Sequence, residues 1–326
     1  MLVDRFGRKH TSLRVSVTDR CNLRCTYCMP ADTPDYAERK EILTFEEITR
    51  VVRIAAGLGV DDVRLTGGEP LVRSQLHKLV ASIGEISGIN KISLTTNGIL
   101  LADQLPGLLS AGLKSVNISL DALDEPSFAQ ITRRPGLKRV LDVIATCQEQ
   151  GLKVKINAIA MRDFTENQIL AFGKFARRTG IPVRFIEFMP LDADGNWDET
   201  KVLSGQQILK MFVEQVRPMV PKSEPNAAPA TDYEFDDGVG TVGIIASVTE
   251  PFCSTCNRFR LTADGQLRNC LFGGDSGDVR QLLRSGSSDE AIAKLLQDAV
   301  FSKQRGHGTD DLSFERPSRP MYAIGG

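Results

Sequence analysis

Three cysteines near the start of the chain have the spacing that says most about chemistry. Cys21, Cys25 and Cys28 form a C-x3-C-x2-C run. Four cysteines complete the ligation of a [4Fe–4S] cluster that carries electrons, whereas three leave one iron open to a substrate or a second cofactor. The spacing therefore predicts an iron–sulfur cluster at which a reaction can begin.

Structural zinc and disulfides are the alternatives for these thiols. A zinc site takes four ligands, usually from paired C-x2-C knuckles, and the nearest histidine, His10, stands well before the run. A disulfide framework is disfavoured because seven cysteines in 326 residues are sparse and odd in number. We therefore expect a reducing compartment and an iron–sulfur site.

A second cysteine triplet lies near the other end of the chain. Cys253 and Cys256 share a loop, and Cys270 follows at the far end of a predicted hairpin. A zinc knuckle lacking its fourth ligand, or unrelated buried cysteines, would explain this triplet taken alone. Beside the first triplet, a second cluster with an open iron explains it better. Cys147 falls in the apolar pattern of a helix, which predicts a core residue.

The elements that must position these cysteines alternate between short β-branched apolar runs and helical patterns. Strands are predicted over residues 13–18, 62–65, 91–95, 115–120, 153–160 and 183–188. Helices are predicted from the capping box at Thr44 to about Gly57, and over residues 76–86, 137–150 and 165–178. Six such units need right-handed crossovers but are too few for the eight-stranded barrel. We therefore predict an α/β fold, a partial (β/α)6 barrel that is open on one side.

The pattern changes after about Met189. A polar segment (192–200), a helix (206–213), a proline-rich connection (218–229), a strand (241–248) and a hairpin turning at Ala263-Asp264-Gly265 follow in order. We predict two domains. Residues 1–230 form the barrel core, and residues 231–326 form a small α+β region that closes the barrel, carries the second cluster and ends in Gly325-Gly326.

Composition restricts the classes of partner. The chain is 41% hydrophobic and 25% charged, with a formal net charge of −1, as in ordinary globular proteins. Nucleic-acid binders concentrate positive charge, so a small polyanion fits better than a polymer. Residues 1–10 are polar and no apolar run reaches the length of a membrane span, so we expect a cytoplasmic location.

The first triplet, with Tyr27 just before its last cysteine, resembles the signature of the radical S-adenosylmethionine (SAM) superfamily. The resemblance implies that SAM chelates the fourth iron and that an electron from the cluster cleaves it, giving methionine and a 5′-deoxyadenosyl radical. It also implies an active site at the carboxyl ends of the strands. Gly67-Gly68-Glu69-Pro70, Asn97 and Asp121 follow three of the predicted strands there.

Both triplets and the terminal Gly325-Gly326 together resemble the molybdenum cofactor biosynthesis protein A family, whose members are GTP 3′,8-cyclases. The resemblance extends from about Leu13 to the last residue. Further motifs carry it, in chain order: Arg64-Leu-Thr-Gly-Gly-Glu-Pro70, Leu94-Thr-Thr-Asn-Gly98, Asn117-Ile-Ser-Leu-Asp121, Arg184-Phe-Ile-Glu-Phe-Met189 and Phe252-Cys-Ser-Thr-Cys256.

The resemblance implies roles for individual residues. The first triplet would hold a SAM-cleaving [4Fe–4S] cluster, and Cys253, Cys256 and Cys270 would hold a second whose free iron meets the guanine ring. SAM would be contacted by Tyr27, Gly68, Ser119 and Met189. GTP would be contacted by Arg14, Arg64, Thr95, Lys155, Arg184, Arg258 and Arg260. Each arginine taken alone would be a solvated surface charge, and the glycine pair alone would be a strand-to-helix turn.

Strand alternation places Arg258 and Arg260 on one face and Phe259 on the other, so both guanidiniums can reach one phosphate ligand. The Gly325-Gly326 end would ordinarily be a frayed terminus. The resemblance instead implies that this tail enters the active site, so Arg258, Arg260, Gly325 and Gly326 are predicted to serve catalysis. No role is assigned to His10, His77 or His307, for which solvated or packing positions are expected.

The implied reaction is a radical SAM-dependent cyclisation of GTP to (8S)-3′,8-cyclo-7,8-dihydroguanosine 5′-triphosphate, the first step of molybdenum cofactor biosynthesis. An external electron donor and a downstream cyclic pyranopterin monophosphate synthase are the implied partners, and a homodimer is expected only by analogy. Two alternatives remain. One is a radical SAM peptide- or protein-modifying enzyme with an auxiliary cluster, and the other is a non-catalytic iron–sulfur electron carrier.

Overall fold

The computed structural model describes residues 1–222, 228–308 and 314–325. Within these residues twelve strands form one sheet, in the order β12-β11-β10-β1-β2-β3-β4-β5-β6-β9-β8-β7. The strands are β1 (Ser12–Ser16), β2 (Asp62–Thr66), β3 (Lys91–Thr96), β4 (Ser115–Ser119), β5 (Lys153–Ala160), β6 (Val183–Glu187), β7 (Met219–Pro221), β8 (Thr231–Phe235), β9 (Thr241–Ile245), β10 (Arg258–Leu261), β11 (Gln266–Arg268) and β12 (Gly277–Asp278).

The first six strands confirm the predicted open array of β/α units. They lie side by side, parallel and in chain order, from β1 to β6. The helices are α1 (Phe45–Gly57), α2 (Leu76–Gly84), α3 (Leu101–Ser110), α4 (Glu125–Thr132), α5 (Leu137–Glu149), α6 (Ile169–Thr179), α7 (Gly205–Gln215), α8 (Val279–Arg284), α9 (Asp289–Phe301) and α10 (Met321–Ile324), with short 3-10 helices η1 (Arg39–Glu41), η2 (Pro70–Val72), η3 (Thr165–Gln168), η4 (Glu199–Lys201) and η5 (Cys253–Thr255).

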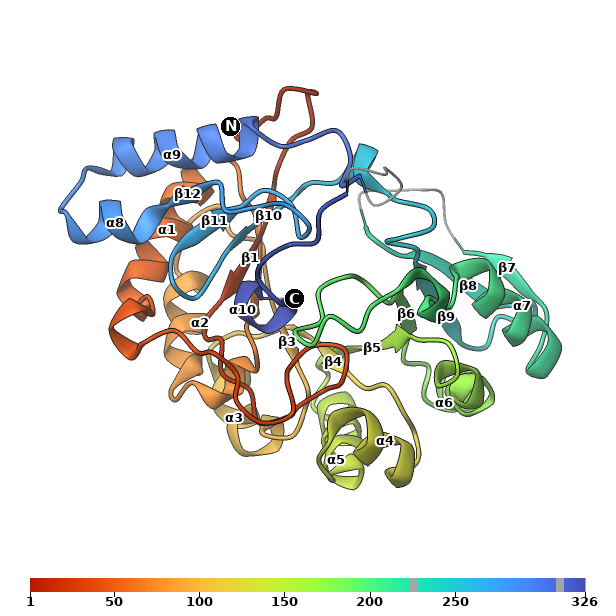
Figure 1. The fold of residues 1–326 in the computed structure, drawn as a ribbon. Helices are drawn as coiled ribbons and strands as arrows, with labels where there is room; N and C mark the ends of the chain where they lie inside the picture. Colours follow the sequence, from red (N-terminus) through yellow and green to blue (C-terminus); the bar gives the residue numbers. More distant parts are fainter. Residues whose placement is uncertain (223–227, 309–313, 326) are drawn as a thin grey trace.

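Alternation along the strands gives the sheet two different faces. In β1, Leu13 and Val15 are fully buried in the main core, while Arg14 between them lines a cavity on the other face. Helices α1 to α6 follow the outer face of the curved sheet, as Figure 1 shows. The capping box at Thr44 begins α1 as predicted, with Glu47 N donating to Thr44 Oγ1 and Thr44 N donating to Glu47 Oε2.

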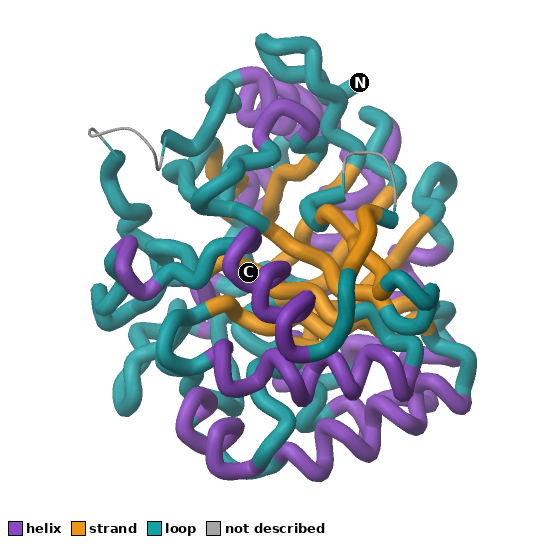
Figure 2. The backbone as a smooth tube through the Cα atoms, turned by 90° about the vertical axis from the view of Figure 1, so that its right-hand side faces the viewer, coloured by secondary structure: helices purple, strands orange, loops and turns teal. Residues whose placement is uncertain are grey.

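The C-terminal region lengthens the sheet at both edges. Strand β9 pairs in parallel with β6, and β10 pairs in parallel with β1. The predicted hairpin is present, because β10 and β11 are antiparallel with Leu261 opposite Leu267. In Figure 2 the C-terminal end of the chain lies beside the strands rather than at the periphery of the molecule.

Some elements differ from the prediction. The proline-rich connection is not wholly a linker, because Met219–Pro221 forms the edge strand β7 against β8, where a proline costs no ladder bond. Residues 223–227 of that connection lie outside the described residues. Helix α3 was not predicted because Pro106 and Gly107 interrupt its apolar pattern. Among the described residues, no helix combines the length and the apolar character needed to cross a membrane.

Candidate active site

Both cysteine triplets line one cavity on the inner face of the sheet. Its empty volume is about 1910 Å³, including space open to solvent. All seven cysteines are free thiols. The structure therefore brings six cysteines from the two ends of the chain to one place, namely Cys21, Cys25, Cys28, Cys253, Cys256 and Cys270.

The first triplet lies on one continuous loop after β1. Backbone bonds shape that loop, because Cys28 N and Met29 N both donate to Cys25 O at 3.0 Å, and Arg24 Nη1 donates to Cys21 O at 2.8 Å. Burial raises the pKa of the Cys25 thiol well above its usual range and raises that of Cys21 to about 11. Within the described part of the chain, no neighbouring cation offsets the effect of burial on these thiols, so a bound metal is what would stabilise their thiolates.

Glu69 connects the loops that follow β2 and β3. It is 1% exposed, and its carboxylate accepts from Thr96 Oγ1 at 2.7 Å and from Asn97 N at 2.7 Å. Burial raises the pKa of Glu69 to about 7 despite these bonds. Asn97 Nδ2 in turn donates to Asn22 Oδ1 in the cysteine loop at 2.8 Å. A titratable carboxyl group is thus held inside the cavity next to the first triplet.

Gly67 and Gly68 are required by the packing of two loops. A Cβ on Gly67 would stand 2.5 Å from Thr18 O, and one on Gly68 would stand 2.5 Å from Arg20 O. Gly68 N donates to Thr18 O at 2.7 Å. The close approach that the sequence indicated is therefore made to the chain just before the cysteine loop, while both glycines also line the cavity.

Tyr27 is held by a carboxylate at the end of β4. Its hydroxyl donates to Asp121 Oδ2 at 2.8 Å, and Ile159 N donates to Asp121 Oδ1 at 2.8 Å. Burial raises the pKa of Asp121 to about 6, against the effect of these two bonds. Asp121, which follows β4, thus fixes the side chain of Tyr27, the residue directly before Cys28 in the cysteine loop. Ser119 and Met189, the other predicted SAM contacts, line the same cavity.

The second triplet is assembled from two separate segments. Cys253 begins the turn η5, Cys256 follows that turn directly, and Cys270 follows β11. Burial would raise the pKa of Cys256, but Arg258 and Lys303 beside it lower the value to about 6. Arg258 Nη2 lies 3.4 Å from Cys256 Sγ. This thiol, unlike those of the first triplet, has positive charge in direct contact.

The donor sets fit iron–sulfur clusters. Each triplet offers three sulfur ligands facing a cavity, which suits a cluster whose fourth iron binds something else. Among the described residues, no three His, Cys, Asp or Glu side chains are arranged to hold one metal ion. In a four-iron cluster each thiolate binds a different iron, so the sulfur atoms need not converge on a single point.

A row of arginines runs across three strands between the triplets. Arg14 is directly opposite Arg260 on one side and Arg64 on the other. Arg258 and Arg260 both line the cavity, while Phe259 between them is 2% exposed in the core, as the alternation predicted. In the part of the chain that the structure describes, Arg14, Arg64, Arg258 and Arg260 form no ion pair with a carboxylate.

These like charges lower one another's pKa. Burial, and then the neighbouring Arg258, lowers the pKa of Arg260 to about 10, and burial with Arg64 lowers that of Arg14 well below its usual range. Buried cations without a counter-charge are costly. The row therefore forms a site that an anion would stabilise, and a polyphosphate is the small polyanion that paired guanidiniums suit.

The remaining predicted GTP contacts differ in position. Thr95 and Arg184 line the cavity, but Arg184 Nη2 also pairs with Asp232 Oδ2 at 3.1 Å. Lys155 on β5 does not line the cavity and lies half-buried in the sheet. Burial, followed by repulsion from Arg184, lowers the pKa of Lys155.

The C-terminal tail reaches the arginine row. Arg260 Nη1 donates to Gly325 O at 2.8 Å, and Ile324 is 1% exposed. Gly325 has φ +78°, and a Cβ there would stand 2.7 Å from Ser16 Cβ in β1. Figure 1 shows α10 between the two sides of the sheet. Gly326 lies outside the described residues.

Several neighbours of the triplets had no predicted role. Lys303 is 4% exposed and donates to Cys256 Sγ. Its place in the sequence, just after α9, does not indicate this contact. His10 is 1% exposed and its Nε2 forms a hydrogen bond of 3.0 Å with Asp4 Oδ2, so its ring is buried rather than solvated. His307 packs on Phe272 with ring centroids 4.6 Å apart, and His77 is exposed. Cys147 is a fully buried core residue, as predicted.

Two protein families match the chain in sequence. Residues 15–176 match the Radical SAM superfamily, and residues 181–309 match the family described as Molybdenum Cofactor Synthesis C. Among solved structures, SuiB from Streptococcus suis bound to S-adenosylmethionine has 14% identity and a TM-score of 0.62, covering 89% of this chain and 68% of that one. Native anSMEcpe with bound AdoMet has 16% identity and a TM-score of 0.62, covering 93% and 84%. The fold and the matched region define the radical SAM class.

Full-length relatives identify the family within that class. A protein of Rhodopirellula baltica named GTP 3′,8-cyclase is 47% identical over 330 residues, covering 100% of this chain and 92% of its own. Another of that name from Mycobacterium sp. (strain KMS) is 47% identical and covers 100% and 93%, and one from Paenarthrobacter nicotinovorans is 42% identical and covers 100% and 97%. The chain belongs to the GTP 3′,8-cyclase family.

Proposed function

We propose that the protein converts GTP to (8S)-3′,8-cyclo-7,8-dihydroguanosine 5′-triphosphate, using SAM and two [4Fe–4S] clusters. One observation carries the proposal. A single cavity holds two three-cysteine sets from opposite ends of the chain, with an arginine row between them that lacks carboxylate partners among the described residues. The names of the relatives, which match along the whole chain, support GTP as the substrate.

Each triplet has its own part in this proposal. Cys21, Cys25 and Cys28 would hold the cluster that cleaves SAM, and the other three cysteines would hold the cluster that contacts the guanine ring. When bound, the first cluster and SAM would supply a radical able to abstract hydrogen from C3′ of the ribose, with 5′-deoxyadenosine as the by-product. Bond formation between C3′ and C8 would leave an unpaired electron on the purine, and one electron from the external reductant with one proton would complete the dihydro product. The chain's own contribution is to place the reacting atoms and to exclude water.

The residues around the first triplet would orient SAM. Tyr27, fixed by Asp121, belongs to the cysteine loop, and Gly68 lies against the chain just before that loop. Ser119 and Met189 line the same cavity. We propose that all four contact SAM. The buried carboxyl of Glu69 lies where the ammonium group of a methionine moiety could pair with it.

The arginine row would bind the triphosphate. We assign GTP contacts to Arg14, Arg64, Thr95, Arg184, Arg258 and Arg260, and we propose that Lys155 acts through the charge it adds near Arg184. Arg258, Arg260 and the Gly325-Gly326 tail would serve the later steps, because Arg260 joins the row to Gly325 and Arg258 contacts Cys256. The region 231–326 is then the unit that binds the nucleotide base.

An external reductant, a downstream synthase that takes the product, and a homodimer are parts of the same proposal. The test is anaerobic incubation of reconstituted protein with SAM, GTP and dithionite, followed by mass spectrometry. We expect 5′-deoxyadenosine and the cyclised nucleotide to form together in equal amounts. Formation of 5′-deoxyadenosine without any GTP-derived product would reject the substrate, and no SAM cleavage would reject the enzyme.

A further inference from the structure

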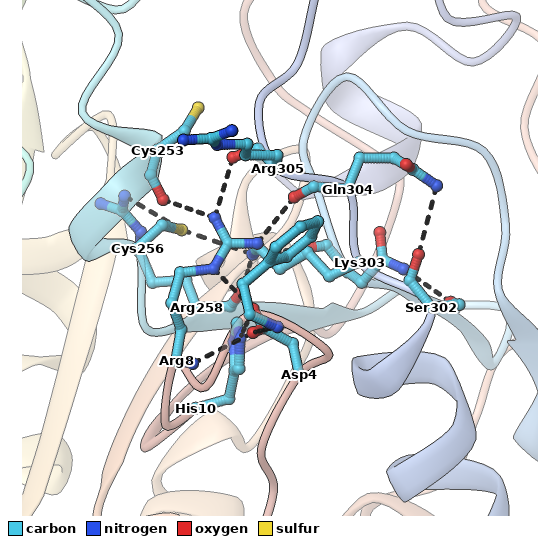
Figure 3. Close-up of polar contacts among 12 residues, drawn as sticks. Asp4, Arg8, His10, Cys253, Cys256, Arg258, Ser302, Lys303, Gln304 and Arg305 are labelled. Atoms are coloured by element: carbon cyan, nitrogen blue, oxygen red, sulfur yellow. Dashed lines mark hydrogen bonds and ion pairs between the residues drawn. The ribbon is translucent and has the colours of Figure 1, made fainter.

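We propose that Lys303 is a positioning residue for the second cysteine triplet, joining the two segments that carry it and placing a positive charge against Cys256. The inference rests on the proposed function, since it assumes that this triplet holds a cluster. Lys303 follows α9 and is remote in sequence from all three cysteines. Figure 3 shows it directed toward Cys256 and Arg258.

The ammonium group of Lys303 uses each of its three N–H donors. It donates to Cys256 Sγ at 3.4 Å, to Arg258 O at 2.7 Å and to Asn269 O at 2.5 Å. Arg258 follows the loop that carries Cys253 and Cys256, and Asn269 directly precedes Cys270. A single side chain therefore bridges the two segments whose separation sets the distance between the sulfur ligands.

The ammonium group of Lys303 is buried. Among the described residues Lys303 forms no ion pair with an aspartate or glutamate, and only 4% of its surface is exposed. A buried ammonium is costly unless an anion faces it. Sulfur is what faces this ammonium group, because Cys256 is in contact and Cys270 adds to the same local field. Thiolates bound to a cluster would supply the counter-charge.

The N-terminal segment holds Lys303 in place from the other side. Arg8 Nη1 donates to Cys253 O at 2.6 Å, and Arg8 Nη2 donates to Gln304 O at 2.6 Å. Asp4 fixes that guanidinium, since its Oδ2 accepts from Arg8 Nε at 2.6 Å and lies 3.0 Å from His10 Nε2 (Figure 3). The residue after Lys303 and the first cysteine of the triplet are thus held by one arginine.

A fixed positive charge beside a ligand sulfur has a measurable electronic effect. Reduction adds one negative charge to the cluster, and a cation in contact with the ligand stabilises that extra charge. Removing the cation should therefore lower the reduction potential of the second cluster. A residue that merely filled space would leave the potential unchanged, which separates the two roles.

The experiment isolates the second cluster in a chain carrying Cys21→Ala, Cys25→Ala and Cys28→Ala. In this background Lys303→Met, which keeps length and removes charge, is compared with Lys303→Arg, which keeps charge. Lys294→Met is the matched control, since Lys294 is an exposed lysine of α9 paired with Asp298 at 2.5 Å. Iron content and the midpoint potential, followed by electron paramagnetic resonance, are measured for each.

We expect Lys303→Met to lower the ratio of reduced to oxidised cluster at least tenfold at a fixed potential, a shift of about 59 mV for one electron. Lys303→Arg should restore most of the midpoint potential, and Lys294→Met should have the same potential as the background without a lysine substitution. Loss of the cluster in Lys303→Met with retention in Lys303→Arg also supports the inference. SAM cleavage by Lys303→Met with the first triplet restored shows that the chain still folds.

Three results would overturn the inference. One is an unshifted potential in Lys303→Met with the cluster retained, and another is equal loss of the cluster in Lys303→Met and Lys303→Arg, which would indicate packing alone. These leave the proposed function standing. The third is an unsubstituted protein with only one cluster per chain, which would remove the second cluster from the proposed function and this inference with it.

Discussion

The two cysteine triplets are built in opposite ways. The first lies on eight consecutive residues after β1, and backbone bonds within that loop shape it. The second is assembled from η5 and the end of β11 and is tied together by Lys303 and Arg8, from the two ends of the chain. Burial raises the pKa of Cys25, whereas Arg258 and Lys303 lower that of Cys256 to about 6 despite burial. A local site and a site assembled from distant segments thus meet in one cavity.

The difference suggests a division of work. Among the described residues no cation contacts Cys25 or Cys28, so a cluster on the first triplet would keep its electron density, which suits a centre that must give an electron away. The second lies against Arg258, Arg260 and Lys303, which suits a centre that meets an anionic substrate. Predictions that separate the two sites test this division most directly.

The largest effect should come from removing one cysteine of each triplet. Cys25→Ala should abolish 5′-deoxyadenosine formation, because its cluster would lose the ligation that presents SAM. Cys270→Ala should keep part of SAM cleavage but lose the cyclised nucleotide entirely. Chromatography of both products under anaerobic conditions measures this. Equal loss of both products in the two variants would mean that the triplets do not have separate roles.

The next largest effect concerns the tail that lies against the arginine row. Gly325→Ala would force an L side chain to φ +78° with its Cβ 2.7 Å from Ser16 Cβ. The left-handed backbone alone costs about 1–2 kcal/mol, and the collision adds to it, so Gly325 should leave its position. We expect cyclised product to fall about tenfold or more, since each 1.4 kcal/mol is a factor of ten.

Two variants serve as controls for the tail. Gly57→Ala, at a helix end with nothing within 4 Å of the new Cβ, should leave turnover unchanged. Ser16→Gly combined with Gly325→Ala removes the nearest colliding atom and should recover part of the activity, because only the backbone strain and a tight contact of 3.2 Å with Thr66 Cγ2 remain. Full activity in Gly325→Ala alone would show that the tail has no part in turnover.

A smaller effect is expected within the arginine row. Arg260→Ala removes one charged donor from the cavity and frees Gly325 O, while both triplets keep their cysteines. Hydrogen bonds to charged groups contribute roughly 1.5–3 kcal/mol, so GTP affinity should fall about ten- to a hundredfold. Equilibrium dialysis with GTP measures affinity, and iron content checks the clusters. Arg177→Ala, on the outer helix α6, should change neither. Unchanged GTP affinity in Arg260→Ala would remove it from the nucleotide site.

Local patterns allowed most of this architecture to be predicted. The six strands, the capping box at Thr44 and the cysteine loop all depend on neighbours in sequence, and the structure has them within a few residues of their predicted bounds. Alternation was enough to separate Arg258 and Arg260 from Phe259. These features follow from periodicity and capping, which a single sequence contains.

The parts that could not be predicted depend on long-range contacts. Nothing near Lys303 in the sequence indicates that it will lie against Cys256. His10 is buried near Lys303 and the backbone of Arg258, both far along the chain. Strand β7 was not predicted because the prolines in and around it indicate a linker, and only its pairing with β8 makes it a strand. Each of these outcomes is set by tertiary packing, which overrides local propensity.

The smallest effect is expected for the seventh cysteine, which belongs to neither triplet. Cys147 on α5 is fully buried among apolar neighbours, and the pKa of its thiol is raised to about 11 by burial alone. Cys147→Ala should therefore keep about eight irons per chain if both triplets hold four-iron clusters. Deleting one buried sulfur should cost roughly 1 kcal/mol of stability through the small cavity it leaves. Iron analysis and thermal unfolding of the same sample measure the two quantities. A loss of about four irons in Cys147→Ala would instead indicate that Cys147 is a cluster ligand, and the assignment of one cluster to each triplet would then be wrong.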